Sequence, residues 1–199
     1  MASDDIWILG ITMTKFGKRP DDDIIDLASE AALGALKDGG VTMKDMGVLA
    51  AGNLMYAQAG IGQQLQKQIG QTGIPVYNVA NACATGATAL RTAIMAVKAG
   101  ECDMGLAVGV EKLSGAGLLA GGSRKEDTPT WEPSGRYGAV AAVDGRIGTE
   151  IMPGVFAQIG MEYGHKYGGT SFELFAKISE KNHAHPTLNP LAAYQKRFT

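Results

Sequence analysis

The sequence predicts an α/β domain built in layers around a largely parallel sheet, followed by a mostly helical segment. Between residues 4 and 113, short apolar runs of strand length alternate with segments of helical periodicity. From Ser114 onward the chain is rich in glycine, mixed in charge and poor in strand signals. We therefore expect two parts: an α/β half over residues 1–113 and a second domain over residues 114–199.

The first elements are marked by an apolar run and by a capping signal. Ile6 to Ile11 (IWILGI) is continuously apolar, which predicts a strand buried on both faces. Asp21 to Asp23 can cap a helix whose apolar face starts at Ile24, and Gly39 and Gly40 end that helix. Val48 to Leu54 (VLAAGNL) predicts the second strand.

The rest of the first half repeats the alternation. We expect a short helix over Gln63–Ile69, a third strand over Val76–Ala80, a long helix over Ala84–Lys98 and a fourth strand over Met104–Val110. The inner face of the long helix is predicted to consist of Ala87, Leu90, Ile94 and Val97.

The second part begins with a long glycine-rich insert and continues with two helical patterns. Loops as long as residues 114–150 are usually functional when they occur in compact proteins. Helices are expected over Gly154–Tyr167 and Ser171–His183.

Composition excludes several classes of function. With 45% hydrophobic residues and 19% charged residues, the chain can bury a core. The net charge of -2 and the absence of a basic stripe argue against nucleic acid as a partner. No apolar run reaches the roughly 18 residues of a membrane helix, and the acidic start does not resemble a secretory signal. Two cysteines make no disulfide framework, which favours a cytoplasmic location.

Cys83 lies in the stretch VYNVANACATGATAL, at the point where a strand gives way to a helix. Reactive sites of open α/β sheets lie at the carboxyl ends of strands, and a helix N-terminus favours a thiolate. The small neighbours Ala82, Ala84 and Gly86 would let a substrate approach, and the Cys83 N–H could stabilise an oxyanion. The alternative is that Cys83 is a small buried hydrophobe, which is the role that we assign to Cys102.

The segment NACATGATAL resembles the active-site segment of thiolases, most closely those of the sterol-carrier or lipid-transfer type. GECDMGLAVGVEKLS resembles the strand after the nucleophile helix of that family, and the helical part from Pro153 to Pro190 resembles its loop domain. The likeness implies a thiolase-like layered βαβαβ half with a mostly helical loop (lid) domain inserted after it.

The resemblance also implies a function. Cys83 would accept an acyl group in the thiolytic cleavage or condensation of a 3-oxoacyl-CoA with a lipid or sterol side chain. Coenzyme A would be a substrate, with no bound cofactor and no metal. The family likeness further implies a homodimer that pairs through the strand near Val76 to Ala80.

The resemblance also implies site residues in the loop domain. Because the loop domain of the family covers the coenzyme A channel, Arg124 and Arg136, with Lys125 and Arg146, become candidates for phosphate contacts. Met152, Phe156 and Met161 become candidates for the acyl site. Ordinary surface charge is the commoner explanation of such cationic residues, and ordinary core packing is the commoner explanation of such apolar ones.

A thiolase has two similar halves, and the base histidine, the Asn-Glu motif and the Cys-x-Gly segment of the family all belong to the second half. We therefore expect the loop domain to be incomplete without a downstream half. The histidines here, His165, His183 and His185, are better explained as surface or capping residues. Either the natural chain continues, or a second polypeptide supplies the other half, or the reaction has been lost.

Two other functions stay open at this point. One is a thiolase-like retro-aldolase that cleaves steroid or fatty side-chain CoA esters. Family members of that kind lack the cysteine, whereas this chain retains it. The other is a non-catalytic subunit of a hetero-complex that binds acyl-CoA or lipid.

Overall fold

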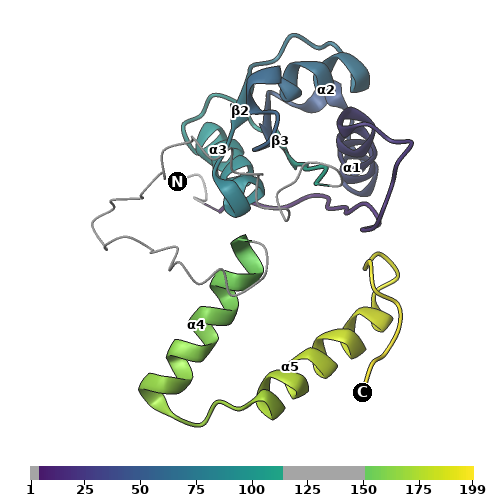
Figure 1. Ribbon diagram of the computed structural model, residues 1–199. Coiled ribbons are helices and arrows are strands. Elements are labelled where there is room, and N and C mark those ends of the chain that lie inside the picture. Colours follow the sequence, from purple (N-terminus) through teal and green to yellow (C-terminus); the bar gives the residue numbers. More distant parts are fainter. Residues whose placement is uncertain (1–4, 114–150) are drawn as a thin grey trace, which may run out of the picture. The chain divides into compact units, whose positions relative to one another are not determined.

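The computed structural model describes residues 5–113 and 151–199, with side chains from residue 156 onward in the second range (Figure 1). These residues form two units. The first contains residues 5–113 and the segment Asn189–Ala193, and the second contains residues 151–188 and Tyr194–Thr199. Each unit is described by itself.

The first unit is built on three parallel strands. They are β1 (Val48–Gly52), β2 (Val76–Val79) and β3 (Gly105–Gly109), in the spatial order β2-β1-β3. Gly52 at the end of β1 is in register with the last residues of both neighbours, Val79 and Gly109. The prediction of an α/β fold with a parallel sheet is confirmed, with each of these strands one or two residues shorter than expected.

Helices connect the strands and cover both faces of the sheet (Figure 1). They are α1 (Ile24–Asp38), α2 (Ile61–Ile69) and α3 (Thr85–Lys98). Short 3-10 turns lie between them at Met43–Asp45, Ala57–Ala59 and Ala82–Ala84. The larger core cluster joins α1, α2 and one sheet face, and a smaller one joins α3 to the other face.

The two faces of the sheet differ in side-chain size. On the face toward α1 and α2, the strands present larger residues, among them Leu49, Leu106 and Val108. On the face toward α3 the residues are mostly small, because Gly105, Ala107 and Gly109 alternate with the larger residues of β3. The alternation of small and large residues along β3 therefore brings α3 closer to the sheet than a bulky face would allow.

Direct backbone contacts confirm this close approach. A Cβ at Gly109 would lie 2.8 Å from the Cα of Gly86 in the first turn of α3. A Cβ at Gly52 would lie 2.8 Å from Cγ2 and 2.9 Å from the carbonyl oxygen of Thr85. The N-terminal end of α3 is thus seated against the ends of β1 and β3.

The predicted inner face of α3 is wrong. The buried residues of the helix are Thr85, Ala89, Ala93 and Ala96, whereas Ala87 and Leu90 are exposed and Ile94 and Val97 are half-buried. The reason is the glycine-rich face of the sheet. It leaves room for small side chains only, so the large apolar residues of α3 do not face the sheet.

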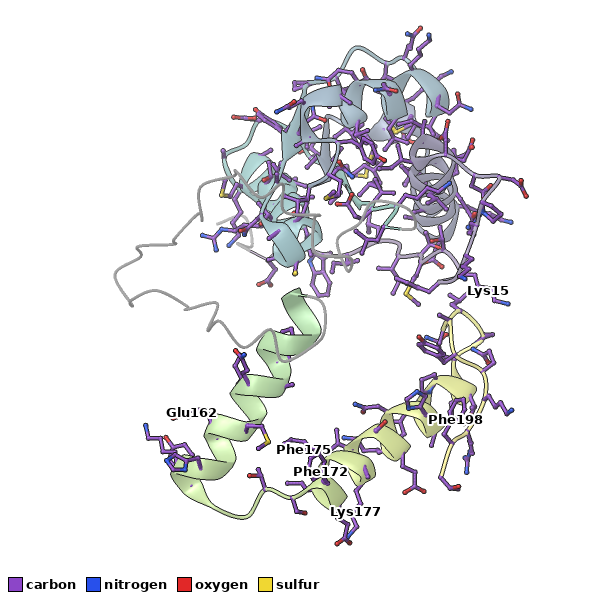
Figure 2. The ribbon with its side chains drawn as sticks, in the orientation of Figure 1. Lys15, Glu162, Phe172, Phe175, Lys177 and Phe198 are labelled. Atoms are coloured by element: carbon purple, nitrogen blue, oxygen red, sulfur yellow. The ribbon has the colours of Figure 1, made fainter. Side chains whose placement is uncertain are left out.

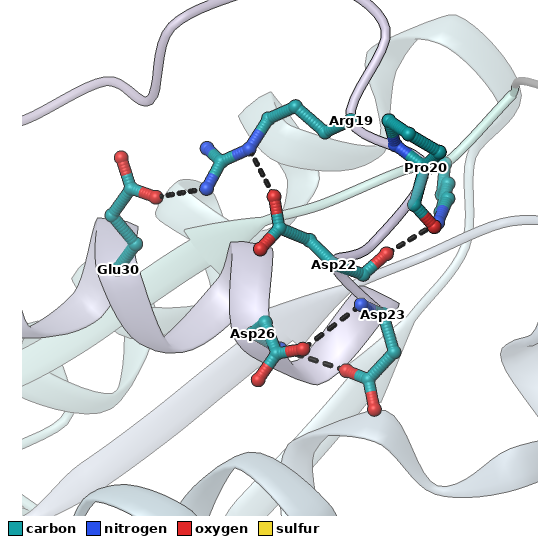
Figure 3. Close-up of polar contacts among 7 residues, drawn as sticks. Arg19, Pro20, Asp22, Asp23, Asp26 and Glu30 are labelled. Carbon is teal, nitrogen blue, oxygen red and sulfur yellow. Dashed lines mark hydrogen bonds and ion pairs between the residues drawn. The ribbon is translucent and has the colours of Figure 1, made fainter.

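The start of α1 follows the predicted cap. The Asp23 side chain accepts hydrogen bonds from the N–H groups of Ile25 and Asp26, and the Asp26 side chain accepts one from Asp23. Before this cap, Arg19 pairs with Asp22 and, at 2.6 Å, with Glu30 of α1 (Figure 3). The Lys112 ammonium donates to the carbonyl oxygen of Asp22, which ties this turn to the residues after β3.

The prediction of a strand over Ile6–Ile11 is wrong. No strand forms there, and Trp7 is 78% exposed. The segment is held against the end of α1 instead, where the Ile11 N–H donates to Asp38 Oδ2 at 2.9 Å. A continuously apolar run predicts a strand only where a layer covers each face, and no described element covers Trp7.

A cavity of about 560 Å³ lies between this segment and β3. Its lining includes Ile8 from the segment and the side-facing residues of α3, Leu90, Ile94 and Val97. Among the described residues, β3 pairs on one side only, with β1. Three of the four residues predicted to form the inner face of α3 therefore line this cavity, and Ala87 does not.

The second unit is a pair of helices, α4 (Ile151–Tyr167) and α5 (Phe172–Ala184), followed by a 3-10 turn at His185–Leu188. The two predicted helices are confirmed within three residues. The turn between them is tight, because a Cβ at Gly164 would lie 1.6 Å from the Thr170 hydroxyl oxygen. Phe172, near this turn, is 86% exposed, and Phe175 follows one turn later (Figure 2).

Gly86 and Gly109 face each other, and an alanine substitution at each should affect the free energy of unfolding differently. Gly109→Ala should lower the free energy of unfolding by about 2 kcal/mol, because its Cβ would overlap the backbone of α3. Gly86→Ala is the matched control. Its Cβ comes no closer than 3.8 Å to Gly109, and alanine favours a helix, so stability should stay equal or rise by up to about 1 kcal/mol. Urea unfolding of both variants tests this, and equal losses would contradict the close-contact account.

Candidate functional site

The carboxyl ends of the three strands meet at one edge of the sheet. Because the strands are parallel, residues that follow β1, β2 and β3 all lie at this edge. Two backbone hydrogen bonds join the ends, from Asn53 N–H to the Val79 oxygen at 3.1 Å and from Val110 N–H to the Gly52 oxygen at 3.0 Å.

Cys83 lies at this edge, in the 3-10 turn Ala82–Ala84 between β2 and α3. The prediction that it lies where strand gives way to helix is confirmed. Its side chain is exposed and forms no disulfide, so it is not walled off by packed hydrocarbon in this unit. The adjoining end of α3 favours negative charge, including an oxyanion that would form on an attacked carbonyl.

The turn that carries Cys83 has an unusual backbone and a tight set of hydrogen bonds. Ala82 has φ +44°, a left-handed conformation that is uncommon for alanine. The Thr85 hydroxyl accepts from the Asn81 N–H and donates to the Ala82 oxygen, both at 2.7 Å. The Asn81 side chain also donates to the Thr88 hydroxyl at 3.0 Å. The Thr85 hydroxyl therefore ties the start of α3 to the turn that carries Cys83.

A second polar group at the same edge was missed in the sequence. The buried side chain of Asn53 donates to the Val110 oxygen at 2.8 Å and to Glu111 Oε1 at 3.0 Å. The Glu111 carboxylate also accepts from the N–H groups of Leu54, at 2.9 Å, and Met55, at 3.3 Å. A polar residue near the end of one predicted strand, Asn53, and a carboxylate directly after another, Glu111, were the signal that could have revealed this pair.

Cys102, the other cysteine, is half-buried before β3, and a Cβ at Gly47 would lie 2.3 Å from its Cβ. Burial raises the pKa of its thiol, and the charges of Glu101 and Asp103 raise that pKa further. This environment supports the structural role predicted for Cys102.

The other predicted site residues lie elsewhere. Arg124 and Arg136, with Lys125 and Arg146, fall outside the described residues, and so does the side chain of Met152. Phe156 and Met161 are 64% and 61% exposed on α4 in the second unit, so they belong to a different unit from Cys83.

The three histidines also belong to the second unit. His183 Nδ1 lies 2.8 Å from the Ser179 oxygen, and its ring contacts that of Phe198 with centroids 5.0 Å apart. The contact of Nδ1 with the Ser179 oxygen agrees with the surface or capping role predicted for His183, and the ring contact with Phe198 was not predicted. Within the residues that the structure describes, no helix combines the length and apolarity needed to cross a bilayer.

Comparisons with known proteins agree on one family. Residues 6–131 match the family model of the thiolase N-terminal domain. Chicken (Gallus gallus) sterol carrier protein 2 is 37% identical, over 98% of this chain and 35% of that protein. An acetyl-CoA acetyltransferase of Methanothermobacter thermautotrophicus is 31% identical, over 98% of this chain and 48% of that protein. The chain thus spans between a third and a half of these relatives.

A solved structure also matches part of the chain. In 3-oxoacyl-(acyl-carrier-protein) synthase III from Aquifex aeolicus, the likeness covers 48% of this chain and 32% of that one, with 24% identity and a TM-score of 0.45.

The environments of the two cysteines predict selective alkylation. At neutral pH, iodoacetamide should modify Cys83 at least about tenfold faster than Cys102, because Cys83 is exposed whereas the raised pKa of Cys102 leaves little thiolate. Raising the pH should accelerate labelling of Cys102 as its thiol ionises. Peptide mass spectrometry over time measures both rates, and equal rates at neutral pH would contradict the prediction.

The Glu111 contacts predict a loss of stability on truncation. Glu111→Ala should lower the free energy of unfolding by about 1 to 2 kcal/mol, because two N–H groups and the Asn53 amide lose their acceptor. Glu101→Ala, at an exposed position before β3, is the control and should change stability by less than about 0.5 kcal/mol. Similar unfolding midpoints for both variants would show that the Glu111 contacts contribute nothing.

Proposed function

This chain belongs to the thiolase family, and we propose that it is the nucleophile half of a coenzyme A-dependent acyltransferase of the lipid or sterol type. Cys83 is the acyl acceptor in this proposal. The observation that carries it is the exposed thiol at the carboxyl edge of the sheet, directly before α3. The likeness to sterol carrier protein 2 over 98% of the chain supports the choice of substrate class.

The proposed reaction is the cleavage of a 3-oxoacyl-CoA. The Cys83 sulfur attacks the C3 carbonyl, an S–C bond forms, and the bond between C2 and C3 breaks. The thiol proton ends on C2 of the released acetyl-CoA, and the acyl group stays on the sulfur. A second coenzyme A then takes the acyl group as its thioester, which restores the Cys83 thiol. Condensation is the same sequence in reverse.

The site provides part of what this chemistry needs. Backbone N–H groups at the start of α3 favour the oxyanion that forms when the carbonyl is attacked. The small residues around Cys83 leave its backbone open to a substrate. In the second domain, Phe156, Met161 and Met152 are proposed acyl contacts, and Arg124 and Arg136 are proposed contacts for a phosphate of coenzyme A.

The general base is proposed to come from residues beyond this chain. None of the three histidines is assigned the role, and the relatives are two to three times as long as the part that matches. A further segment or a second polypeptide would supply this base. A base and a second oxyanion donor each contribute about 100-fold or more in rate, so this chain by itself should react slowly.

A homodimer through β2 is the proposed assembly. Among the described residues, β2 pairs on one side only, with β1, and Tyr77 on it is 42% exposed. Edge strands with free N–H and C=O groups pair readily with another strand.

The proposal predicts a covalent acyl-enzyme. Incubation with hexanoyl-CoA should add one hexanoyl group to the intact chain, because a thioester exchanges with an accessible thiol and releases free coenzyme A. Cys83→Ala should abolish the adduct, and Cys102→Ala should retain it. Intact-mass spectrometry measures the adduct.

Two outcomes would contradict the proposal. One is an adduct that survives in Cys83→Ala. The other is the absence of any adduct in a chain whose Cys83 is readily alkylated, which would favour a subunit that only binds acyl-CoA.

A further inference from the structure

We infer that Thr85 is a positioning residue, which holds Cys83 in place for attack by locking Ala82 in a left-handed conformation. The inference rests on the proposed role of Cys83 as the nucleophile. It concerns the turn Asn81–Cys83 and the hydroxyl group that spans it.

The turn contains backbone strain next to the thiol. Ala82 has φ +44°, and among the described residues it is the one non-glycine residue with a positive φ. This conformation costs an L-residue about 1 to 2 kcal/mol, because its Cβ crowds the backbone. Strain of this kind persists only where the surroundings impose it, and it often occurs at functional sites.

The Thr85 hydroxyl is the group that imposes it. Its oxygen accepts from the N–H of Asn81, the residue before Ala82, and donates to the carbonyl of Ala82, both at 2.7 Å. The two bonds hold the Ala80–Asn81 peptide unit through its N–H and the Ala82–Cys83 peptide unit through its C=O, so they restrict rotation across Asn81 and Ala82 together. The direction in which the chain enters Cys83 is therefore fixed by one side chain.

Thr85 is itself rigidly seated. It is 7% exposed, and its Cγ2 and carbonyl oxygen contact the backbone at Gly52, where β1 ends. The hydroxyl therefore connects the Cys83 turn to the end of β1 in the sheet. Thr88 adds a weaker support, because it accepts from the Asn81 side chain at 3.0 Å and is less buried.

α3 also supplies a matched control. The Thr92 hydroxyl donates to the Thr88 carbonyl oxygen at 2.9 Å, which is an ordinary bond within the helix. Thr92→Val removes the same hydroxyl group from the same helix, two turns away from the Cys83 thiol.

The test is the rate of Cys83 alkylation by iodoacetamide, with the Cys102 peptide as an internal reference. Thr85→Val keeps the shape and removes the hydroxyl, and it should slow alkylation about fivefold as the thiol moves away from the helix end. Thr85→Ser keeps the hydroxyl, so its rate should stay within about twofold of the parent rate. The alkylation rate of Thr92→Val should also stay within about twofold of the parent rate.

A double variant separates positioning from general damage. Glycine adopts φ > 0 without a steric cost, so Ala82→Gly in the Thr85→Val background should recover most of the lost rate. If Thr85→Val does not fold, the same double variant should fold again. A parent-like rate in Thr85→Val, a rate in Thr85→Ser as slow as that of Thr85→Val, or no recovery by Ala82→Gly would each overturn the inference.

The experiment also distinguishes this inference from the proposed function. Iodoacetamide reports how the thiol is presented and needs no acyl-CoA. If the rates follow the expected order while hexanoyl-CoA leaves no adduct on the parent chain, the proposed function fails and the role of Thr85 in presenting the thiol stands.

Discussion

The backbone contact between α3 and the sheet is the constraint on which the rest of the unit depends. Gly52 at the end of β1 packs against the side chain and carbonyl group of Thr85, and Gly109 at the end of β3 packs against the backbone of Gly86. Beyond Thr85, the buried face of the helix consists of alanines, at Ala89, Ala93 and Ala96. Because protein interiors are packed densely, a contact between backbones places a helix more narrowly than a contact through flexible side chains. The start of α3, and the thiol before it, are placed in this way.

This placement of α3 puts Cys83 at the carboxyl edge of the sheet, which is the candidate reaction site. Three chain segments end there, and each is tied down by polar groups: the turn after β1 by Glu111, the turn after β2 by Thr85, and the residue after β3 by Asn53. Two of these ties involve nearly buried side chains, those of Asn53 and Thr85. A rigid frame around one exposed sulfur is what a nucleophile needs, because misplacement by about 1 Å lowers reaction rates severely.

The sequence predicted those elements whose signals are local. The cap at Asp23, the places of β1, β2 and β3 in the chain and the position of Cys83 follow from neighbouring residues. Features that depend on distant partners were missed or wrong. The small residues on one face of β3 determine which side of α3 is buried. The spacing of apolar residues within the helix does not contain this information. The run Ile6–Ile11 has the composition of a buried strand, but no described element covers Trp7. The Asn53–Glu111 pair needed the strand register.

A crystal structure of the chain after exposure to an acyl-CoA would test the central claim most directly. The account predicts continuous density from Sγ of Cys83 to the acyl carbon, with the acyl oxygen turned toward the backbone N–H groups at the start of α3. It also predicts that Ala82 keeps its left-handed conformation. An unmodified Cys83, with the acyl-CoA bound away from the carboxyl edge of the sheet, would contradict the account.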